Sequence, residues 1–388
     1  MAEIKSLTCI ECGHGHQAEI FYKCERCEGS LDIEYNYEMH REEAEAAGKK
    51  ESGIWKYRSF LPVAPNSEPV TLGEGNTPLL RMPSLEMELE QSEIYFKNES
   101  ANPTLAFKDR ALSVALTAAK QFNVEGVITA STGNTGVSAA AYAARAKLPC
   151  KIYVPKKTPN EKLRLMKIYG AEISLVEGNF SDAYLMAAQQ AETTEWFNVT
   201  STFLNPYAVE GNKTIAYEIH EQFGDVPDWI VIPIGAGPLL VACFKGFKEL
   251  QLAGKTSKLP RMAGVQAASC APIAAAFENG LEEVAAWKQP IATVASGIAD
   301  PLTTYPKDGT RTLKAIYASD GCGIAVEDDR MLHYQKKLAI EEGVFAEPSS
   351  ATAIAALELM KRKGYLRKNE SVVSVITGHG LKDLMSIQ

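Results

Sequence analysis

The chain has 388 residues, which is long enough for two domains and a small appendage. Apolar residues make up 46% of it and charged residues 23%, as in an ordinary soluble globular protein with a sizeable core. The net charge of −8 argues against nucleic acid or an anionic membrane as a partner. Because no apolar run reaches membrane-spanning length and the first residues do not begin a signal peptide, we expect a cytoplasmic protein.

The N-terminal residues carry two closely spaced cysteine pairs, Cys9 with Cys12 and Cys24 with Cys27. This spacing lets each pair chelate one ion through a tight turn, and four thiolates complete a tetrahedral structural zinc site. We therefore predict a small zinc-ribbon-like segment over residues 1–36. The alternative is a ribbon that no longer binds metal. A closed site of four cysteines leaves no position for a substrate, so we expect structure from it and no chemistry.

Residues 37–93 are predicted to form a linker, with a charged linker helix near residues 39–50, and the start of a large domain. From residue 94 onward, strand-length apolar runs alternate with helical stretches. The predicted strands are 126–130, 150–154, 172–176, 229–232 and 371–376, and the predicted helices are 137–147, 160–169, 182–193, 212–223 and 240–253. This alternation is typical of α/β proteins with two open, mostly parallel sheets and flanking helices. We expect a smaller α/β domain over residues 94–205 and a larger one over residues 206–388.

Lys108 is the candidate catalytic residue. The turn at Asn102, Pro103 and Thr104 disfavours helix before it, so Lys108 is expected in the first turn of the helix that follows. The helix dipole and the neighbouring Phe107 both favour the neutral amine there. A neutral lysine can form a Schiff base with a carbonyl cofactor and later act as a base. The alternative is a helix-start lysine that pairs with Asp109.

Two further loops each follow a predicted strand and precede a predicted helix. In the first, the side chains and free backbone N–H groups suit a carboxylate, although a simple helix cap needs only one such side chain. Its polar residues are Ser131, Thr132, Asn134 and Thr135. The second loop is a candidate seat for a cofactor phosphate, formed by Gly235, Ala236, Gly237 and Leu239.

The end of the last predicted strand carries Thr377, whose hydroxyl is a candidate contact for a ring nitrogen. Residues 347–350 precede the predicted helix 351–361, and an ordinary N-cap explains them sufficiently.

Several motifs occur in the order found in one enzyme superfamily. They are Gly-Glu-Gly-Asn-Thr-Pro-Leu at 73–79, Asn-Pro-Thr and Phe-Lys-Asp-Arg within 102–110, Ala-Ser-Thr-Gly-Asn-Thr-Gly at 130–136, residues 342–345 with 347–350, and Thr-Gly-His-Gly-Leu-Lys-Asp at 377–383. From about residue 50 to its end, the chain resembles the pyridoxal-phosphate (PLP) enzymes of the tryptophan synthase β-subunit superfamily, and within them the threonine synthase family. The resemblance implies PLP fold type II, and relatives that are often dimers make a homodimer the expected state.

The resemblance also implies roles for individual residues. Lys108 would form the Schiff base with PLP beside Phe107, Asn134 would contact the 3′-oxygen of the cofactor, and Thr377 would contact its pyridine nitrogen. Ser131, Thr132 and Thr135 would hold the α-carboxylate of the substrate. A hydroxyl at the ring nitrogen leaves the ring largely unprotonated, which suits elimination and replacement and restrains transamination.

The chain departs from the threonine synthase pattern at three places. Leu105 and Ala106 stand where the family usually has Gly-Ser, and Pro238 removes one backbone donor from the phosphate loop. Phe203 and Ala208 stand where a polar group and an arginine usually grip the substrate phosphate. Losing a bidentate guanidinium contact costs on the order of a few kcal/mol. The candidate cations to replace it are Lys156, Lys157, Arg164 and Lys213.

The expected activity is PLP-dependent elimination or replacement at Cβ or Cγ of a small amino acid, as in the threonine synthase reaction of O-phosphohomoserine with water. The altered phosphate site keeps two alternatives open: a serine or threonine dehydratase-like lyase, and a β-replacement enzyme similar to cysteate synthase. A non-catalytic paralogue that serves as a binding module is the alternative from another class, and the intact Phe-Lys-Asp and Ser-Thr-Gly-Asn-Thr motifs speak against it.

Overall fold

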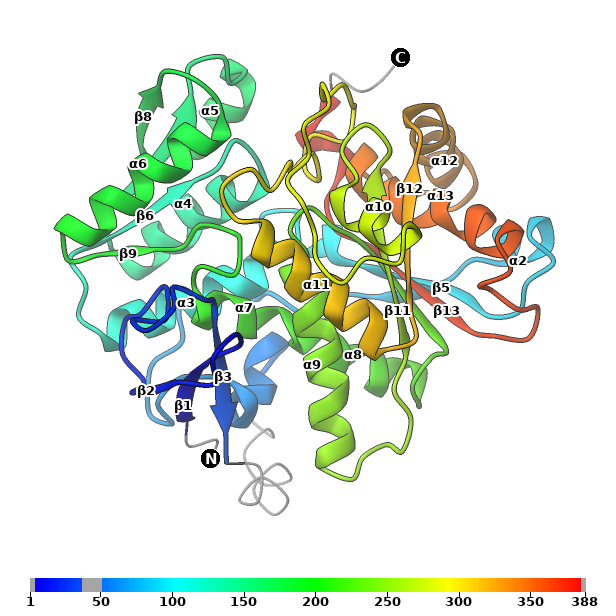
Figure 1. The fold of residues 1–388 in the computed structure, drawn as a ribbon, viewed down its shortest axis with the longest axis horizontal. Coiled ribbons are helices and arrows are strands. Elements are labelled where there is room, and N and C mark those ends of the chain that lie inside the picture. The colour runs from blue at the N-terminus through cyan, green and yellow to red at the C-terminus, as the bar shows by residue number, and fades with distance from the viewer. Residues whose placement is uncertain (1–3, 37–50, 385–388) are drawn as a thin grey trace. The chain divides into compact units, whose positions relative to one another are not determined.

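The computed structural model describes residues 4–36 and 51–384, which divide into two compact units (Figure 1). The first unit takes in the described residues of Met1–Asn76 together with Lys108–Thr214, and the second takes in Thr77–Phe107 and the described residues of Ile215–Gln388. Each unit is therefore assembled from separate stretches of the chain. The predicted linker helix lies outside the described residues. Among the described helices, none is long and apolar enough to span a bilayer.

The main sheet of the first unit has four parallel strands in the order β8-β7-β6-β9. Its strands are β6 (Gly126–Ala130), β7 (Cys150–Pro155), β8 (Glu172–Val176) and β9 (Trp196–Asn198), and its helices are α3 (Lys108–Gln121), α4 (Asn134–Ala146), α5 (Asn160–Lys167), α6 (Phe180–Thr193) and α7 (Pro206–Asn212). Val127 packs in one apolar cluster with α4, and its neighbour Ile128 packs in another with α6. Both faces of the strand are thus covered, as parallel sheets require.

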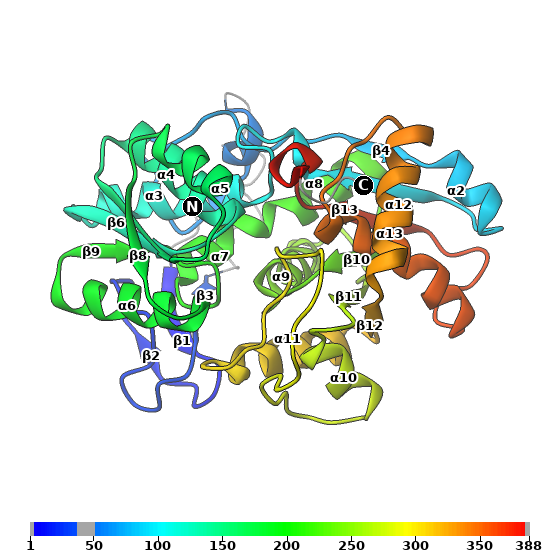
Figure 2. The same ribbon diagram turned by 90° about the horizontal axis from the view of Figure 1, so that it is seen from above.

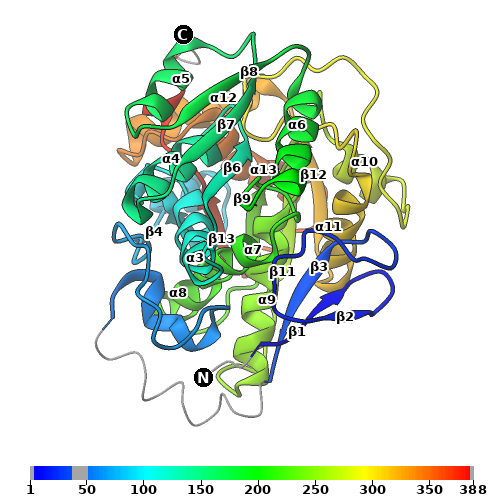
Figure 3. The same ribbon diagram turned by 90° about the vertical axis from the view of Figure 1, so that its left-hand side faces the viewer.

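The N-terminal residues form a small antiparallel sheet in the order β2-β1-β3, which Figure 3 shows beside α7. Its strands are β1 (Ile4–Cys9), β2 (Gly15–His16) and β3 (Leu31–Tyr35). Leu7 and Ile33 are buried in the same apolar cluster as Leu112 and Leu116 of α3. The next described residues include the 3-10 helix η2 (Gly53–Phe60), which packs against Val114.

The second unit has a six-stranded sheet in the order β12-β11-β10-β13-β5-β4, parallel except for the edge strand β4. The strands are β4 (Leu79–Arg81), β5 (Ile94–Asn98), β10 (Trp229–Pro233), β11 (Arg261–Ala267), β12 (Cys322–Val326) and β13 (Val372–Ile376). The helices are α2 (Pro83–Glu88), η3 (Glu99–Ala101), α8 (Thr214–Phe223), α9 (Pro238–Leu252), α10 (Pro272–Glu278), α11 (Pro306–Ala318), α12 (Asp328–Glu341), α13 (Pro348–Arg362) and η4 (Gly380–Lys382). Figure 2 shows α13 on one side of strands β10 to β12, and α9 and α11 on the other.

The predicted α/β class with mostly parallel sheets is confirmed in both units. The helix expected over residues 212–223 is α8, which begins at Thr214, and the short helix α7 before it was not predicted. Strands β4, β5, β9, β11 and β12 of the two larger sheets were not predicted. β4 and β9 have three residues each, which is too short to show a period.

Helices α3 and α7 approach each other closely, and this contact fixes the chain around Lys108. A Cβ added to Gly211 would lie 2.2 Å from the carbonyl oxygen of Arg110 and 2.9 Å from the Cα of Ala111. Arg110 is fully buried, and its Nη1 donates to Thr214 Oγ1 at 3.1 Å. Only glycine at position 211 lets the two backbones come this near.

We therefore expect Gly211→Ala to lower the free energy of unfolding by about 1–3 kcal/mol, since a clash with backbone cannot be relieved by a rotamer change. Alanine has the higher helix propensity, so the loss would be opposite in sign to the propensity effect. The matched control is Gly15→Ala, whose added Cβ would meet its nearest neighbour at 3.8 Å. Equal denaturant midpoints for the two variants would contradict the close-approach explanation.

Candidate active site

Lys108 opens helix α3, as the sequence predicted, and its side chain is half-buried. Its ammonium donates a hydrogen bond to the hydroxyl of Ser201, in the loop that follows β9. The next residue, Asp109, is fully buried, and its Oδ1 accepts a hydrogen bond of 2.6 Å from Ser138 in α4. The carboxylate of Asp109 thus joins α3 to α4, so it is more than the surface partner of a helix-start lysine.

The segment that leads into Lys108 is bonded to the end of β13, within the second unit. The N–H of Phe107 donates to the carbonyl of Thr377 at 3.0 Å, and the N–H of His379 donates to the carbonyl of Leu105 at 3.0 Å. Leu105 has φ +63°, in the left-handed region that costs an ordinary residue roughly 1–2 kcal/mol. The family's usual glycine would avoid that cost. These two hydrogen bonds hold the strained turn that ends directly before Lys108.

The loop between β6 and α4 caps its own helix. Ser131 Oγ accepts hydrogen bonds from the N–H groups of Gly133 and Gly136 at 3.2 and 2.9 Å. Its hydroxyl can therefore interact with a ligand only by donating its own hydrogen. Thr132 and Asn134 are partly exposed beside it. A Cβ added to Gly133 would meet no atom within 4 Å, so there is open space at this helix start. Space next to a positive helix end is suited to a small anion such as a carboxylate.

The loop after β9 is tied to the loop after β6. Asn198 Oδ1 accepts from the N–H and the hydroxyl of Thr200 at 2.9 and 2.7 Å, and Thr200 Oγ1 accepts from the N–H of Ala130 at 3.0 Å. Ser201 follows directly and reaches Lys108. No sequence pattern indicated this contact, because it joins residues 93 positions apart.

The positions where the family grips the substrate phosphate, and one of the four cations named as replacements, are not available to a phosphate here. Phe203 and Ala208 are buried, as apolar residues should be. Lys213 is fully buried, with its Nζ 2.5 Å from a carboxylate oxygen of Glu210 and 4.2 Å from the ring centroid of Tyr35. Lys213 therefore cannot replace the missing arginine. Three exposed cations of the same unit are left as candidates: Lys156, which pairs with Glu177, Lys157 and Arg164.

In the second unit, the predicted phosphate loop joins β10 to α9. Gly237 has φ +94°, and a Cβ there would lie 2.4 Å from Thr312 Oγ1, so the turn requires glycine. Thr312 Oγ1 donates to the carbonyl of Ala236 at 2.6 Å and orients the loop. Pro238 is the first residue of α9, where its missing N–H breaks no helical bond. Four backbone N–H groups of this loop have no protein acceptor among the described residues. They belong to Gly235, Ala236, Gly237 and Leu239.

Thr377 follows β13, and its hydroxyl lies 2.8 Å from that of Ser350 in the first turn of α13. Ser350 Oγ also accepts from the N–H of Gly378 at 2.8 Å, and the N–H of Glu347 donates to the carbonyl of Gly378 at 3.1 Å. The segment expected to be an ordinary N-cap thus holds the last strand's end. Ser350 is a site residue that the sequence did not single out.

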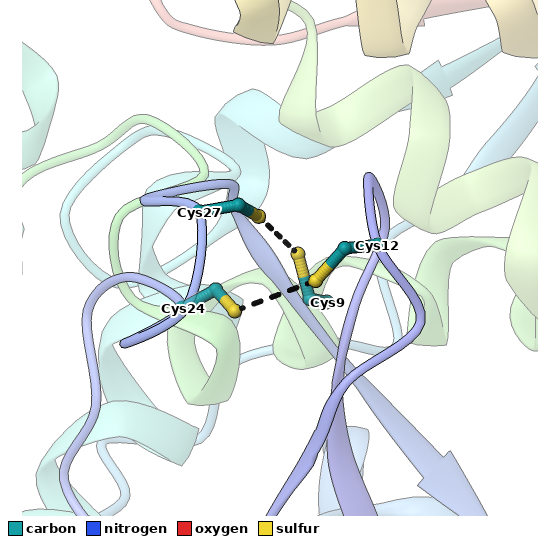
Figure 4. A group of neighbouring side chains, drawn as sticks. All are labelled: Cys9, Cys12, Cys24 and Cys27. Atoms are coloured by element: carbon teal, nitrogen blue, oxygen red, sulfur yellow. Dashed lines mark hydrogen bonds between the residues drawn. The ribbon is translucent and has the colours of Figure 1, made fainter.

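The four N-terminal cysteines converge, as Figure 4 shows. Their sulfur atoms all lie within 4.8 Å of one another, with Cys9 and Cys27 at 3.4 Å and Cys12 and Cys24 at 3.7 Å. Sulfur atoms of a tetrahedral site with bonds of about 2.3 Å are about 3.8 Å apart. The geometry of this cysteine cluster therefore fits four ligands of one ion.

Similarity to known proteins shows the family of this chain. A family profile described as "Pyridoxal-phosphate dependent enzyme" matches residues 70–378. The chain belongs to that family, the pyridoxal-phosphate-dependent enzymes. It is 42% identical over 380 residues to a threonine synthase of Methanocaldococcus jannaschii, covering 97% of this chain and 92% of the relative. It is 36% identical over 384 residues to one of Methanosarcina acetivorans, covering 98% and 93%. Within its family the chain is a threonine synthase-like lyase.

Solved structures show the same fold at lower identity. The processed form of threonine deaminase isoform 2 from Solanum lycopersicum superposes with a TM-score of 0.66 at 24% identity, covering 78% of this chain and 83% of that one. Maize serine racemase gives a TM-score of 0.67 at 21% identity, covering 78% and 88%. These likenesses confirm the fold of the PLP enzymes. The residues present also fit PLP, because a half-buried lysine, a strand-end hydroxyl and a loop with unused N–H donors match its carbonyl, ring nitrogen and phosphate.

Proposed function

We propose that this chain converts O-phosphohomoserine and water into threonine and phosphate with PLP as its cofactor. The observation that carries the proposal is the 42% identity to a threonine synthase over 97% of this chain and 92% of that relative. Lys108 at the start of α3 and the unused N–H donors after β10 support it. We also propose that the protein is a homodimer, because it resembles a family whose members are often dimers. We further propose that it is cytoplasmic, because its sequence is acidic and contains no apolar run of membrane-spanning length.

The proposed roles follow the geometry of each unit. PLP supplies an electron-withdrawing ring that stabilises negative charge at carbons near the amino group of the substrate. Lys108 would hold the cofactor at its carbonyl carbon, and its amine would move protons at Cα and the neighbouring carbons of the substrate. Ser201 accepts a hydrogen bond from the Lys108 amine and orients it. The remaining contacts assigned to the cofactor are Phe107, Asn134, Gly235, Ala236, Gly237, Leu239 and Thr377, and those assigned to the substrate carboxylate are Ser131, Thr132, Asn134 and Thr135.

The pair of hydroxyls at Thr377 and Ser350 bears on the type of reaction. A hydroxyl can donate to an unprotonated ring nitrogen, and Ser350 Oγ at 2.8 Å keeps the hydroxyl of Thr377 oriented. Because neither side chain is a carboxylate, neither stabilises a protonated ring. The ring is then a weaker electron sink, which favours elimination and replacement over transamination.

A second candidate function rests on the buried, apolar Phe203 and Ala208 and on the paired Lys213. Without a guanidinium, the binding of a phosphate dianion loses on the order of a few kcal/mol. A dehydratase-like lyase or a cysteate synthase-like β-replacement enzyme needs no such contact. In a dehydratase, the products would be a 2-oxo acid and ammonia.

Phosphate and threonine release from O-phosphohomoserine distinguishes these functions. We expect the PLP-loaded enzyme to release both in equal amounts, and Lys108→Ala to lower kcat by at least about 10²–10⁴-fold, the usual contribution of acid–base catalysis. The matched control is Lys120→Ala, an exposed lysine in the last turn of the same helix, which should retain activity. No phosphate release, combined with ammonia and 2-oxo acid from serine or threonine, would replace the proposal by the dehydratase. Ample turnover by Lys108→Ala would refute the role of that lysine.

The cysteine cluster is proposed to hold one structural zinc ion. We expect metal analysis of freshly reduced protein to give one zinc per chain and Cys9→Ser to lose it, together with stability, because metal binding is coupled to folding. Cys150→Ser is the control: burial raises the pKa of Cys150 to about 12, so this residue stays a thiol outside the cluster. Absence of zinc from the reduced wild-type protein would count against the site.

A further inference from the structure

The N-terminal segment, residues 4–36, reaches the loop that contacts the catalytic lysine. We propose that Tyr22 of this segment is a positioning residue, which acts through Asn198 and Thr200 on the loop that carries Ser201 and so on Lys108. The inference rests on the proposed role of Lys108 and goes beyond it, since it assigns a catalytic purpose to a segment otherwise explained by its cysteines alone. All the residues involved belong to the first unit.

The first step is the contact between Tyr22 and the end of β9. The N–H of Asn198 donates to the hydroxyl oxygen of Tyr22 at 2.7 Å. Its ring lies 6.3 Å from that of Phe197. Tyr22 thus supplies the acceptor for the last N–H of β9, at the point where the strand becomes a loop.

The second step is the side chain of Asn198, which connects the end of β9 to Thr200 and, through Thr200, to Ala130 at the end of β6. Asn198 Oδ1 accepts from the N–H and the hydroxyl of Thr200, and the hydroxyl oxygen of Thr200 accepts from Ala130, directly before Ser131. The carbonyl of Asn198 accepts from Asn205 Nδ2 at 2.8 Å. Both ends of the loop 198–205 are therefore bonded to Asn198.

The third step is the contact between the loop and the lysine. Ser201 lies between the two ends bonded to Asn198, and its hydroxyl accepts from the Lys108 ammonium. A displacement of Asn198 would move Ser201 relative to Lys108. Because Asn198 is almost fully buried, its N–H cannot turn to water when the phenol oxygen is removed. Strain at this N–H would be relieved by movement of the loop.

Other hydrogen bonds of the N-terminal segment bypass this loop. The hydroxyl of Tyr35 donates to Glu210 at 2.5 Å, and the hydroxyl of Tyr207 donates to the carbonyl of Glu19 at 3.0 Å. Both attach the segment to α7. Removing one of these bonds would weaken the attachment of the segment without changing a contact of the loop 198–205. Such a variant is therefore a matched control for Tyr22.

The test compares Tyr22→Phe with Tyr207→Phe, each of which removes one hydroxyl between the N-terminal segment and the rest of the first unit. In cofactor-free protein, we expect Tyr22→Phe to speed hydrogen exchange of the amides of residues 198–205 by about tenfold or more, and Tyr207→Phe to leave them unchanged. In PLP-loaded protein, Tyr22→Phe should lower kcat about tenfold with little change in KM, and alter the pH dependence of the cofactor's absorbance.

A second pair of variants keeps the proposal falsifiable if Tyr22→Phe folds poorly. Thr200→Val removes the hydroxyl that joins Asn198 to Ala130 at nearly constant volume, and Thr200→Ser retains it. We expect the valine variant to reproduce the exchange and kcat changes, and the serine variant to behave like the wild type.

Equal effects of Tyr22→Phe and Tyr207→Phe would show that both merely dock the segment, which would overturn the proposal. Unchanged exchange and unchanged kcat in Tyr22→Phe and Thr200→Val would overturn it as well. The exchange measurement needs neither cofactor nor substrate. A wild-type protein inactive toward O-phosphohomoserine would therefore refute the proposed reaction while the exchange result still decided the positioning role.

Discussion

The hydrogen bond from the N–H of Phe107 to the carbonyl of Thr377 holds the turn directly before Lys108, and the backbone at the start of helix α3 depends on it. Together with the bond from His379 to Leu105, it holds a leucine at φ +63°. A residue in the left-handed region persists only where its surroundings over-determine it, and functional sites are where such strain is found.

Close helix packing and buried hydrogen bonds hold the backbone and the polar groups around Lys108 in place. Gly211 lets α7 meet α3, Asp109 binds Ser138 of α4, and Thr200 joins the loops after β6 and β9. The N-terminal segment adds Tyr22 to this support. We propose that the cysteine cluster stabilises a segment that also positions the loop carrying Ser201.

The sequence predicted the features that are local. A proline turn before a helix located Lys108, strand-then-glycine patterns located the loops after β6 and β10, and the spacing of four cysteines predicted the cluster in which their sulfur atoms meet. It could not predict contacts that depend on tertiary structure. Ser201 lies 93 residues from Lys108, and Ser350 lies 27 residues from Thr377.

The central claim is that Lys108 is the residue that binds PLP covalently. The most direct test is borohydride reduction of the PLP-loaded enzyme, which makes the lysine–cofactor bond permanent, followed by peptide mapping with mass spectrometry. The account predicts one modified peptide per chain, with the added mass on Lys108 and none in the Lys108→Ala variant. A cofactor mass on a different lysine, or an unmodified Lys108 in protein that contains PLP, would contradict it.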